Sequence, residues 1–326
     1  MQKANTDIAL AAGMKREGIR DGSDFFKKVT PFLGLIVVFA IFATTTEGKF
    51  TAFSNLQLIL IQSAMTMVAG IGVTFVMAHG NLDFSLGGEL AICAVVGIFA
   101  SRITPWMALP ATILTGIVCS SFVAVVHNVM RVPTFVVGLC IMFLGRGIAT
   151  AAAATDPMRT PNEISALDNI WFYLITVVAV YIIAYFIYEY TKIGKYNRVI
   201  GSNEKAAMLS GVPVSKYKLI AFTITGVCLG IAAFMSLIRV GSATGQTGTS
   251  FEINVLIALV LGGVSLTGGS SVKMRSIIVG TLIYMMLNNG LTLLGVNPNL
   301  INSIKTVVFL ASVYAAYDRS SSAVPV

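Results

Sequence analysis

The sequence predicts an all-α polytopic membrane protein, and three observations lead to this fold class. Apolar residues make up 56% of the 326 positions, charged residues only 11%, and the mean hydropathy is +0.84; soluble domains carry about 25% charged residues. The apolar runs are continuous, as in membrane helices, whereas membrane barrel strands alternate over about ten residues. Basic residues gather in alternate loops, as the positive-inside rule requires.

A helix that crosses the hydrocarbon core needs about 17–25 residues, and ten apolar runs meet or approach that length. The third and eighth runs are short, so one of them is a candidate re-entrant segment. We therefore predict about ten transmembrane helices, at Pro31–Thr46, Leu56–Ala78, Gly88–Ser101, Pro105–Met130, Pro133–Ala154, Ile170–Tyr190, Lys218–Ile238, Glu252–Thr267, Arg275–Gly295 and Leu300–Tyr317.

The basic residues orient these helices. With the N-terminus inside, the inner loops and tails hold sixteen basic residues, and the outer loops hold four: Lys49, Arg102, Arg159 and Arg239. This distribution predicts that both termini are cytoplasmic. The chain then divides into a cytoplasmic tail (1–30), a single transmembrane domain (31–318) and a short cytoplasmic tail (319–326).

A large cytoplasmic loop, 191–217, contains a predicted short helix. Ser202 or Asn203 can cap its N-terminus, Glu204 suits its first turn, and Gly211 supplies a left-handed end. A helix of about two turns is unstable alone in water. We therefore expect this helix to pack against another part of the protein or a partner, and to serve as a contact site for a soluble partner.

No soluble-enzyme active site is recognisable. Neither His79 nor His127 has a Cys, His or carboxylate at ligand spacing, and the four cysteines lie unpaired in apolar runs, so we expect neither a metal site nor a disulfide framework. The chain has no GxxxxGK[ST] phosphate loop. We expect no cofactor in this chain and no enzymatic activity, and ATP hydrolysis would require a separate polypeptide.

Polar side chains inside or beside apolar runs are candidates for a solute path, because placing them in lipid is costly. Two glycine-rich interruptions, 79–90 and 260–271, predict broken helices that expose backbone groups to a pathway, with ordinary cytoplasmic turns as the alternative. For the paired asparagines the alternative is a hydrogen bond between helices. The candidate path residues are Asp83, Ser85, Arg146, Glu252, Asn254, Asn288 and Asn289.

Five motifs, in this order, identify a family: NLDFSLG (81–87), PTFVVGLCIMFLGRGI (133–148), IGSNEKAAMLSGVPV (200–214), FEINVLIALVLGGVSLTGG (251–269) and LNNGLTLLGVNP (287–298). From about Leu33 to Asp318 the chain resembles the permease subunits of bacterial ABC importers for monosaccharides of the ribose, galactose and arabinose type. One departure is Asn254, where the family commonly has Asp.

The resemblance implies a plasma-membrane permease that works with an extracytoplasmic sugar-binding protein, an ABC ATPase that holds ATP and Mg²⁺, and a second permease copy or paralogue. It also implies that the loop 191–217 docks on the ATPase. The matching loop positions are Gly201, Ser202, Asn203, Glu204, Ala206, Ala207, Leu209 and Gly211.

Two further expectations remain open at this point. The outer loop 155–169 is a candidate docking surface for the binding protein, through Asp156, Arg159, Glu163 and Asp168, with plain solvated surface as the alternative. An ion-coupled secondary transporter is the alternative function, since Asp83, Glu89 and Glu252 could serve as ion relays, although all three lie near span ends.

Overall fold

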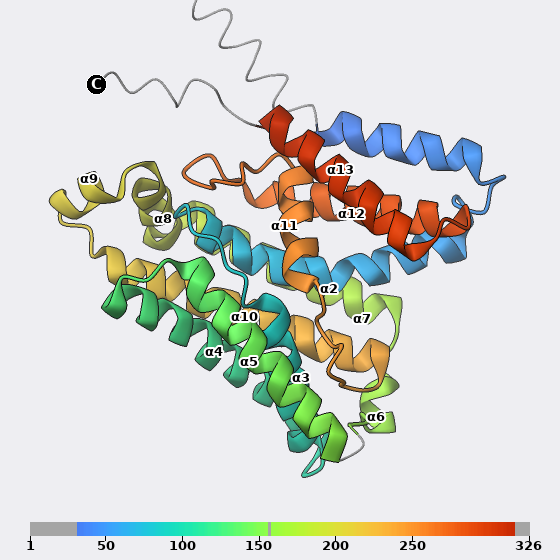
Figure 1. Ribbon diagram of the computed structural model, residues 1–326, viewed down its shortest axis with the longest axis horizontal. Coiled ribbons are helices and arrows are strands. Elements are labelled where there is room, and N and C mark those ends of the chain that lie inside the picture. The colour runs from blue at the N-terminus through green and yellow to red at the C-terminus, as the bar shows by residue number, and fades with distance from the viewer. Residues whose placement is uncertain (1–30, 156–157, 317–326) are drawn as a thin grey trace, which may run out of the picture.

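The computed structural model describes residues 31–155 and 158–316, and helices account for most of them, with no β-strand assigned in these ranges (Figure 1). Six helical segments are long and apolar enough to cross a membrane. Many of their apolar side chains are exposed, as expected where lipid covers the surface. The six are α2 (Phe53–Met77), η1 with α4 (Pro105–Met107, Ala108–Met130), α5 (Thr134–Thr155), α7 (Ile170–Tyr190), α10 (Val214–Val240) and α12 (Met274–Leu293).

The other helices are shorter or less apolar. They are the N-terminal helix Pro31–Thr45, α3 (Leu86–Ser101), α6 (Asn162–Ser165), α8 (Lys192–Ser202), α9 (Glu204–Leu209), α11 (Phe251–Leu261) and α13 (Pro298–Ala316). At 1.5 Å per residue, α3 is about 24 Å long and α11 about 16 Å, whereas the hydrocarbon core is about 30 Å thick. Neither crosses a bilayer alone.

The predicted eighth span, Glu252–Thr267, was therefore wrong in extent. The helix ends at Leu261, because Gly262 begins a turn and Gly263 adopts a left-handed conformation with φ of 88°. A side chain at Gly262 would overlap the carbonyl of Ser276 in α12, so this turn also lets two backbones approach closely. The glycine-rich stretch 260–271 is thus the end of a short helix.

Two groups of four helices repeat the same plan in opposite directions. In each group a long helix (α2 or α10) is followed by a non-helical segment, a short helix (α3 or α11) and two further helices. The packing also repeats: α3 contacts α4 and α5 as α11 contacts α12 and α13, while α10 lies on α4 as α2 lies on α12. This is the inverted repeat common among transporters.

The short helices α3 and α11 begin next to each other inside the bundle. Gly87, in the first turn of α3, lies against the carbonyl of Gly248 and the carboxylate of Glu252, and a Cβ at Gly87 would overlap both. The non-helical segments 78–85 and 241–250 lead into these starts from opposite ends of the bundle (Figure 1).

Two ends of the bundle can be distinguished, named here by the helices they carry. The α8 end holds loops 131–133, 191–213 and 262–273, and the α6 end holds loops 46–52, 102–107, 158–169 and 294–297 (Figure 1).

Candidate functional site

Asp83 and Ser85 shape the backbone where α3 begins. The Asp83 carboxylate accepts hydrogen bonds from the Ser85 amide at 2.9 Å and the Ser85 hydroxyl at 2.5 Å, and both residues are fully buried. Short polar side chains often hold non-helical backbone in this way. The second carboxylate oxygen of Asp83 has no hydrogen-bond partner among the described residues. The two residues thus fix the re-entrant segment inside the bundle.

Arg146 and Glu252 form an ion pair between α5 and α11. Arg146 Nη2 lies 3.2 Å from Glu252 Oε1, with the Glu252 side chain 5% and the Arg146 side chain 28% exposed. Glu252 stands in the first turn of α11, where a carboxylate interacts favourably with the helix dipole. The sequence indicated each residue separately, and the fold brings them together.

Glu89 is a buried carboxylate that the predicted path set did not include. It lies in the first turn of α3, fully buried, and accepts a hydrogen bond of 2.6 Å from the hydroxyl of Ser120 in α4. No spacing in the sequence links α3 to this position of α4, so the pairing could not be found from the sequence.

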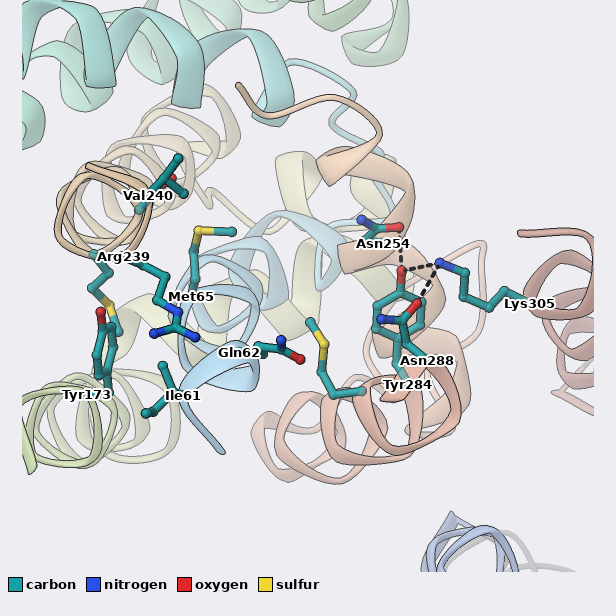
Figure 2. Close-up of a pocket in the computed structure, with 13 residues that line it drawn as sticks. Ile61, Gln62, Met65, Tyr173, Arg239, Val240, Asn254, Tyr284, Asn288 and Lys305 are labelled. Carbon is teal, nitrogen blue, oxygen red and sulfur yellow. Dashed lines mark hydrogen bonds between the residues drawn. The ribbon is translucent and has the colours of Figure 1, made fainter. Parts of the chain in front are cut away.

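Asn254 and Asn288 belong to one polar network, which includes Tyr284 of α12 and Lys305 of α13 (Figure 2). The Tyr284 hydroxyl donates to Asn254 Oδ1 at 2.7 Å. Lys305 Nζ donates to the Tyr284 hydroxyl at 3.2 Å and to Asn288 Oδ1 at 3.3 Å. Sequence reasoning missed Tyr284, because a tyrosine in an apolar run carries no signal of its own.

Asn289, by contrast, joins two helices. Its amide exchanges two hydrogen bonds with Asn55 of α2, at 2.9 and 3.0 Å. Reciprocal amide pairs of this kind hold membrane helices together. For Asn289 the structure supports the interhelical alternative, whereas Asn288 lines a cavity.

The predicted short helix is confirmed as α9, and its cap is Asn203. The Asn203 side chain accepts from the Ala206 amide at 3.0 Å, and Gly211 takes the left-handed conformation with φ of 80°. Ala207 is buried under the loop, while Leu209 is 91% exposed. The helix therefore presents an apolar tip at the α8 end.

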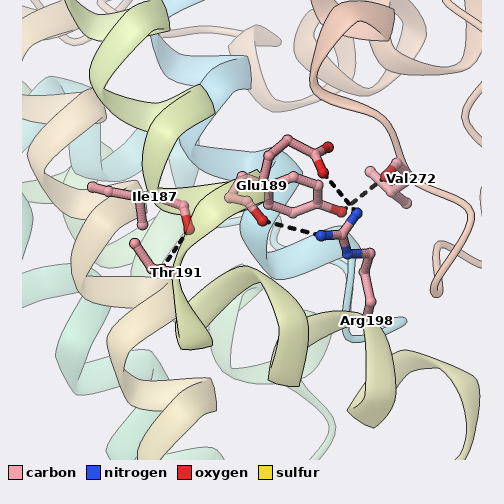
Figure 3. A network of polar contacts seen from close by, with 6 residues as sticks. Ile187, Glu189, Thr191, Arg198 and Val272 are labelled. Carbon is pink, nitrogen blue, oxygen red and sulfur yellow. Dashed lines mark hydrogen bonds and ion pairs between the residues drawn. The ribbon is translucent and has the colours of Figure 1, made fainter.

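Helix α8, before α9, was not predicted. Thr191 caps it by accepting from the Ile193 amide, and Arg198 anchors it to α7 through Glu189 at 2.9 Å and the Tyr188 carbonyl at 3.3 Å (Figure 3). The Tyr188 hydroxyl in turn donates to the Val272 carbonyl at 2.8 Å. The glycines and basic residues of this stretch give little helical signal, and tertiary contacts supply the stability.

Helix α8 also touches the segment that leads into α3. The His79 ring lies 2.8 Å from Asn197 Oδ1, and both residues are buried. A side chain at Gly201 would overlap the Ala78 carbonyl, and its Cβ would lie 3.1 Å from the backbone of Gly269. Helix α8 thus contacts the loops next to both short helices.

Glu204 of α9 is tied to two membrane helices. Lys218 of α10, with a side chain 5% exposed, donates to the Glu204 carboxylate at 2.8 Å and to His127 of α4 at 3.1 Å. His127 Nδ1 donates to the Val132 carbonyl in the loop before α5, at 2.7 Å. A displacement of α9 would therefore reach α10 and α4 directly.

At the α6 end the predicted docking residues differ in their surroundings. Asp168 accepts from Arg239 at 3.1 Å and from the Tyr173 hydroxyl at 2.8 Å. Glu163 is exposed on α6, and Arg159 is exposed where its backbone bridges to Ser242. Asp156 lies outside the described residues. Within those residues, no group of three His, Cys, Asp or Glu side chains is placed to hold a metal ion.

Comparison with known proteins adds a family match. Residues 55–315 match the protein family described as branched-chain amino acid transport system / permease component. The ribose import permease protein of Escherichia coli is 30% identical over 293 residues, covering 86% of this chain and 91% of that protein. The ribose import permease protein of Bacillus subtilis is 30% identical over 307 residues, covering 91% and 94%.

A D-allose transport system permease protein of Escherichia coli is 26% identical over 285 residues, covering 83% of this chain and 86% of that protein. No solved structure matches the chain.

Proposed function

The chain belongs to the family of branched-chain amino acid transport system permease components, and on that basis we propose that it carries a monosaccharide across the bacterial plasma membrane. It is a multi-pass permease subunit of that membrane, not an enzyme. Its relatives are named for ribose and D-allose, which makes a pentose or hexose the substrate class. ATP and Mg²⁺ would be bound by a partner ATPase.

The observation that carries this proposal is the position of helix α9 at the α8 end, where it is attached to α10 and exposes an apolar side chain. Helix α9 exposes Leu209 almost completely, while its other contacts fix it to α10 through Glu204 and Lys218. An exposed apolar tip on a firmly held short helix suits a protein partner that covers it. The ATPase is the proposed partner.

The proposed coupling route runs through α8. Helix α8 contacts Ala78 and His79, which lead into α3, and Gly269, which follows α11. Val272, which also follows α11, accepts a hydrogen bond from Tyr188 of α7. A shift of α8 and α9 would therefore reach both short helices. The permease would act as a two-state element whose balance is set by the ATPase on one face and the binding protein on the other.

The proposed topology has ten membrane-inserted helices and both termini in the cytoplasm. The described loops at the α8 end carry six basic residues, and those at the α6 end carry three, Lys49, Arg102 and Arg159. This asymmetry supports a cytoplasmic α8 end. A reporter fused after residue 326, active only when cytoplasmic, tests the C-terminal side.

The docking of α9 is tested by Leu209→Asp and by Ala207→Pro. The first puts a charge on the exposed tip, and the second removes an amide that donates to the Asn203 carbonyl. Both should abolish uptake and ATPase association while membrane levels stay normal. The control is Leu294→Asp, at a leucine of the α6 end that is 45% exposed, which should retain association. Normal uptake with Ala207→Pro would refute the coupling role.

The remaining partners follow from the same proposal. The exposed apolar faces of α5 and α13 would meet a second permease copy or a paralogue, or lipid. Glu163 and Arg159 at the α6 end would contact an extracytoplasmic sugar-binding protein. Co-purification of tagged permease with both partners tests the assembly.

A second candidate, an ion-coupled secondary transporter, rests on three buried carboxylates: Asp83, Glu89 and Glu252. All three already have structural partners, since Asp83 holds the Ser85 turn, Glu89 accepts from Ser120, and Glu252 pairs with Arg146. Uptake in vesicles that stops without ATP, and persists when the proton and sodium gradients are collapsed, excludes this alternative. Uptake that persists without ATP, and stops when the gradients are collapsed, excludes an ABC importer.

A further inference from the structure

A cavity of about 350 Å³ lies in the half of the bundle nearer the α6 end, and Figure 2 shows the residues that line it. Helices α2, α7, α10, α12 and α13 contribute to its wall, and Asn254 in the first turn of α11 also lines it. Ligand pockets range from roughly 300 to 1,000 Å³, so this one suits a small solute.

The polar groups of the cavity are three neutral amides, three hydroxyls and two cationic side chains: Gln62, Asn254 and Asn288, then Tyr173, Ser236 and Tyr284, then Lys305 and Arg239. Gln62 extends from α2 toward α12, and Figure 2 shows Asn288, Tyr284 and Asn254 beside Lys305. An amide both donates and accepts hydrogen bonds, as a sugar hydroxyl does. The Gln62 amide makes no hydrogen bond to the described residues, and the Asn288 oxygen is engaged only by Lys305. Donors therefore remain for a ligand.

The charges of the cavity argue against a cation as occupant. The residues that line it include Lys305 and Arg239 and no carboxylate. Arg239 is paired with Asp168 outside the lining, and Lys305 donates only to neutral oxygens. An ammonium among neutral acceptors favours a ligand rich in oxygen lone pairs.

Preformed geometry adds to the argument. The chain of bonds from Lys305 through Tyr284 to Asn254 joins α13 and α12 to the start of α11. A solute in the cavity would thus contact one of the two short helices whose starts meet at Gly87 and Glu252. The apolar part of the wall consists of Met65, Met235 and Met285 together with Ile61 and Val240.

We propose that this cavity is a binding site for a neutral polyhydroxylated solute inside the permease, held by Gln62, Asn288 and the Lys305 network. The inference rests on the proposed import function and adds to it a solute site within a single chain. The site would be occupied after release from the binding protein and before passage past α11.

The test uses the complete importer in proteoliposomes, with D-ribose, D-allose and L-arabinose as probes and with both uptake and ATP hydrolysis measured. The variants Gln62→Leu and Asn288→Leu remove amides of the cavity. The control is Asn302→Leu, an exposed residue on α13 that does not line it. We expect each cavity variant to lose at least tenfold in sugar moved per ATP hydrolysed, while ATP hydrolysis stimulated by the binding protein stays within twofold of the control.

Three outcomes overturn the site. In the first, both cavity variants move an amount of sugar per ATP hydrolysed that is within twofold of the control; this result rules out the site and is compatible with the import function. A parallel loss of uptake and ATP hydrolysis shows that the amides support assembly instead. A parent complex that transports none of the three sugars overturns the proposed function and the site with it.

Discussion

His79 Nε2 donates a hydrogen bond to Asn197 Oδ1 across a buried contact of 2.8 Å between the loop after α2 and helix α8. The acceptor is a carboxamide oxygen, so Nε2 carries the proton and Nδ1 is the free acceptor of a neutral ring. Nδ1 has no partner among the described residues. This hydrogen bond connects helix α8 to the segment that enters α3.

The same contact predicts a pH dependence of stability. Burial lowers the pKa of His79 from 6.5 to about 4. Because the folded pKa is the lower one, the unfolded chain binds the extra proton first. Stability is complete above about pH 6.5 and is lost as the pH falls toward 4, by on the order of 3 kcal/mol over the whole window. Melting of the detergent-solubilised protein at pH 7 and pH 5 measures this.

The matched variant is His79→Gln, which keeps a donor toward Asn197 and does not titrate. Its melting temperature should fall less between pH 7 and pH 5 than that of the parent. An equal fall in both proteins would assign the pH dependence to other groups.

Gly201→Ala should separate α8 from the loop after α2. The added Cβ overlaps the Ala78 carbonyl, a backbone atom that has little room to move. We expect a lower melting temperature and a loss of sugar uptake well beyond the loss of binding-protein-stimulated ATP hydrolysis. The control is Gly34→Ala, whose Cβ meets only the Ile283 side chain at 3.7 Å. Equal behaviour of the two variants would remove α8 from the coupling route.

The Arg146–Glu252 pair should show strong coupling in a double-mutant cycle. Removing one partner of a buried ion pair leaves the other charge uncompensated and costs about 3–5 kcal/mol. Glu252→Gln should cost an amount at the low end of that range, because Arg146 is 28% exposed and remains partly hydrated. Arg146→Met should cost more, because it leaves the buried Glu252 carboxylate without its cationic partner. The double variant should recover part of the loss. Additive effects in thermal unfolding would show that the contact is energetically unimportant.

Glu163→Lys and Asp168→Asn should have different consequences, although both residues lie in the same loop. Asp168 accepts from Arg239 and Tyr173, and because this ion pair is partly exposed, its substitution should lower stability by about 1 kcal/mol or less. Glu163 is exposed, so its reversal should leave the melting temperature unchanged and raise the KM for the loaded binding protein. Unchanged uptake kinetics with Glu163→Lys would argue that this surface is merely solvated.

The sequence alone determined the fold class and the family. Continuous apolar runs require helices in lipid, because no water is present to satisfy the backbone, and this pattern needs no tertiary information. The capped helix at Asn203 and its end at Gly211 were also predictable, because caps depend on neighbours within a few residues. Arg146, Glu252, Asn254 and Asn288 stood out because polar groups are rare in membrane spans.

Only the tertiary structure decided which of these groups meet. Asn254 and Lys305 are joined through Tyr284, and Glu89 meets Ser120, over contacts that no local spacing encodes. The extent of α11 was likewise beyond a count of apolar residues, because the glycine turn after Leu261 ends the helix within a run that continues to be apolar. Helix α8 formed where local propensity is weak, because its contacts with α7 and His79 outweigh propensity. Local sequence sets what each segment is able to do, whereas long-range packing selects the partner that each buried polar group finds.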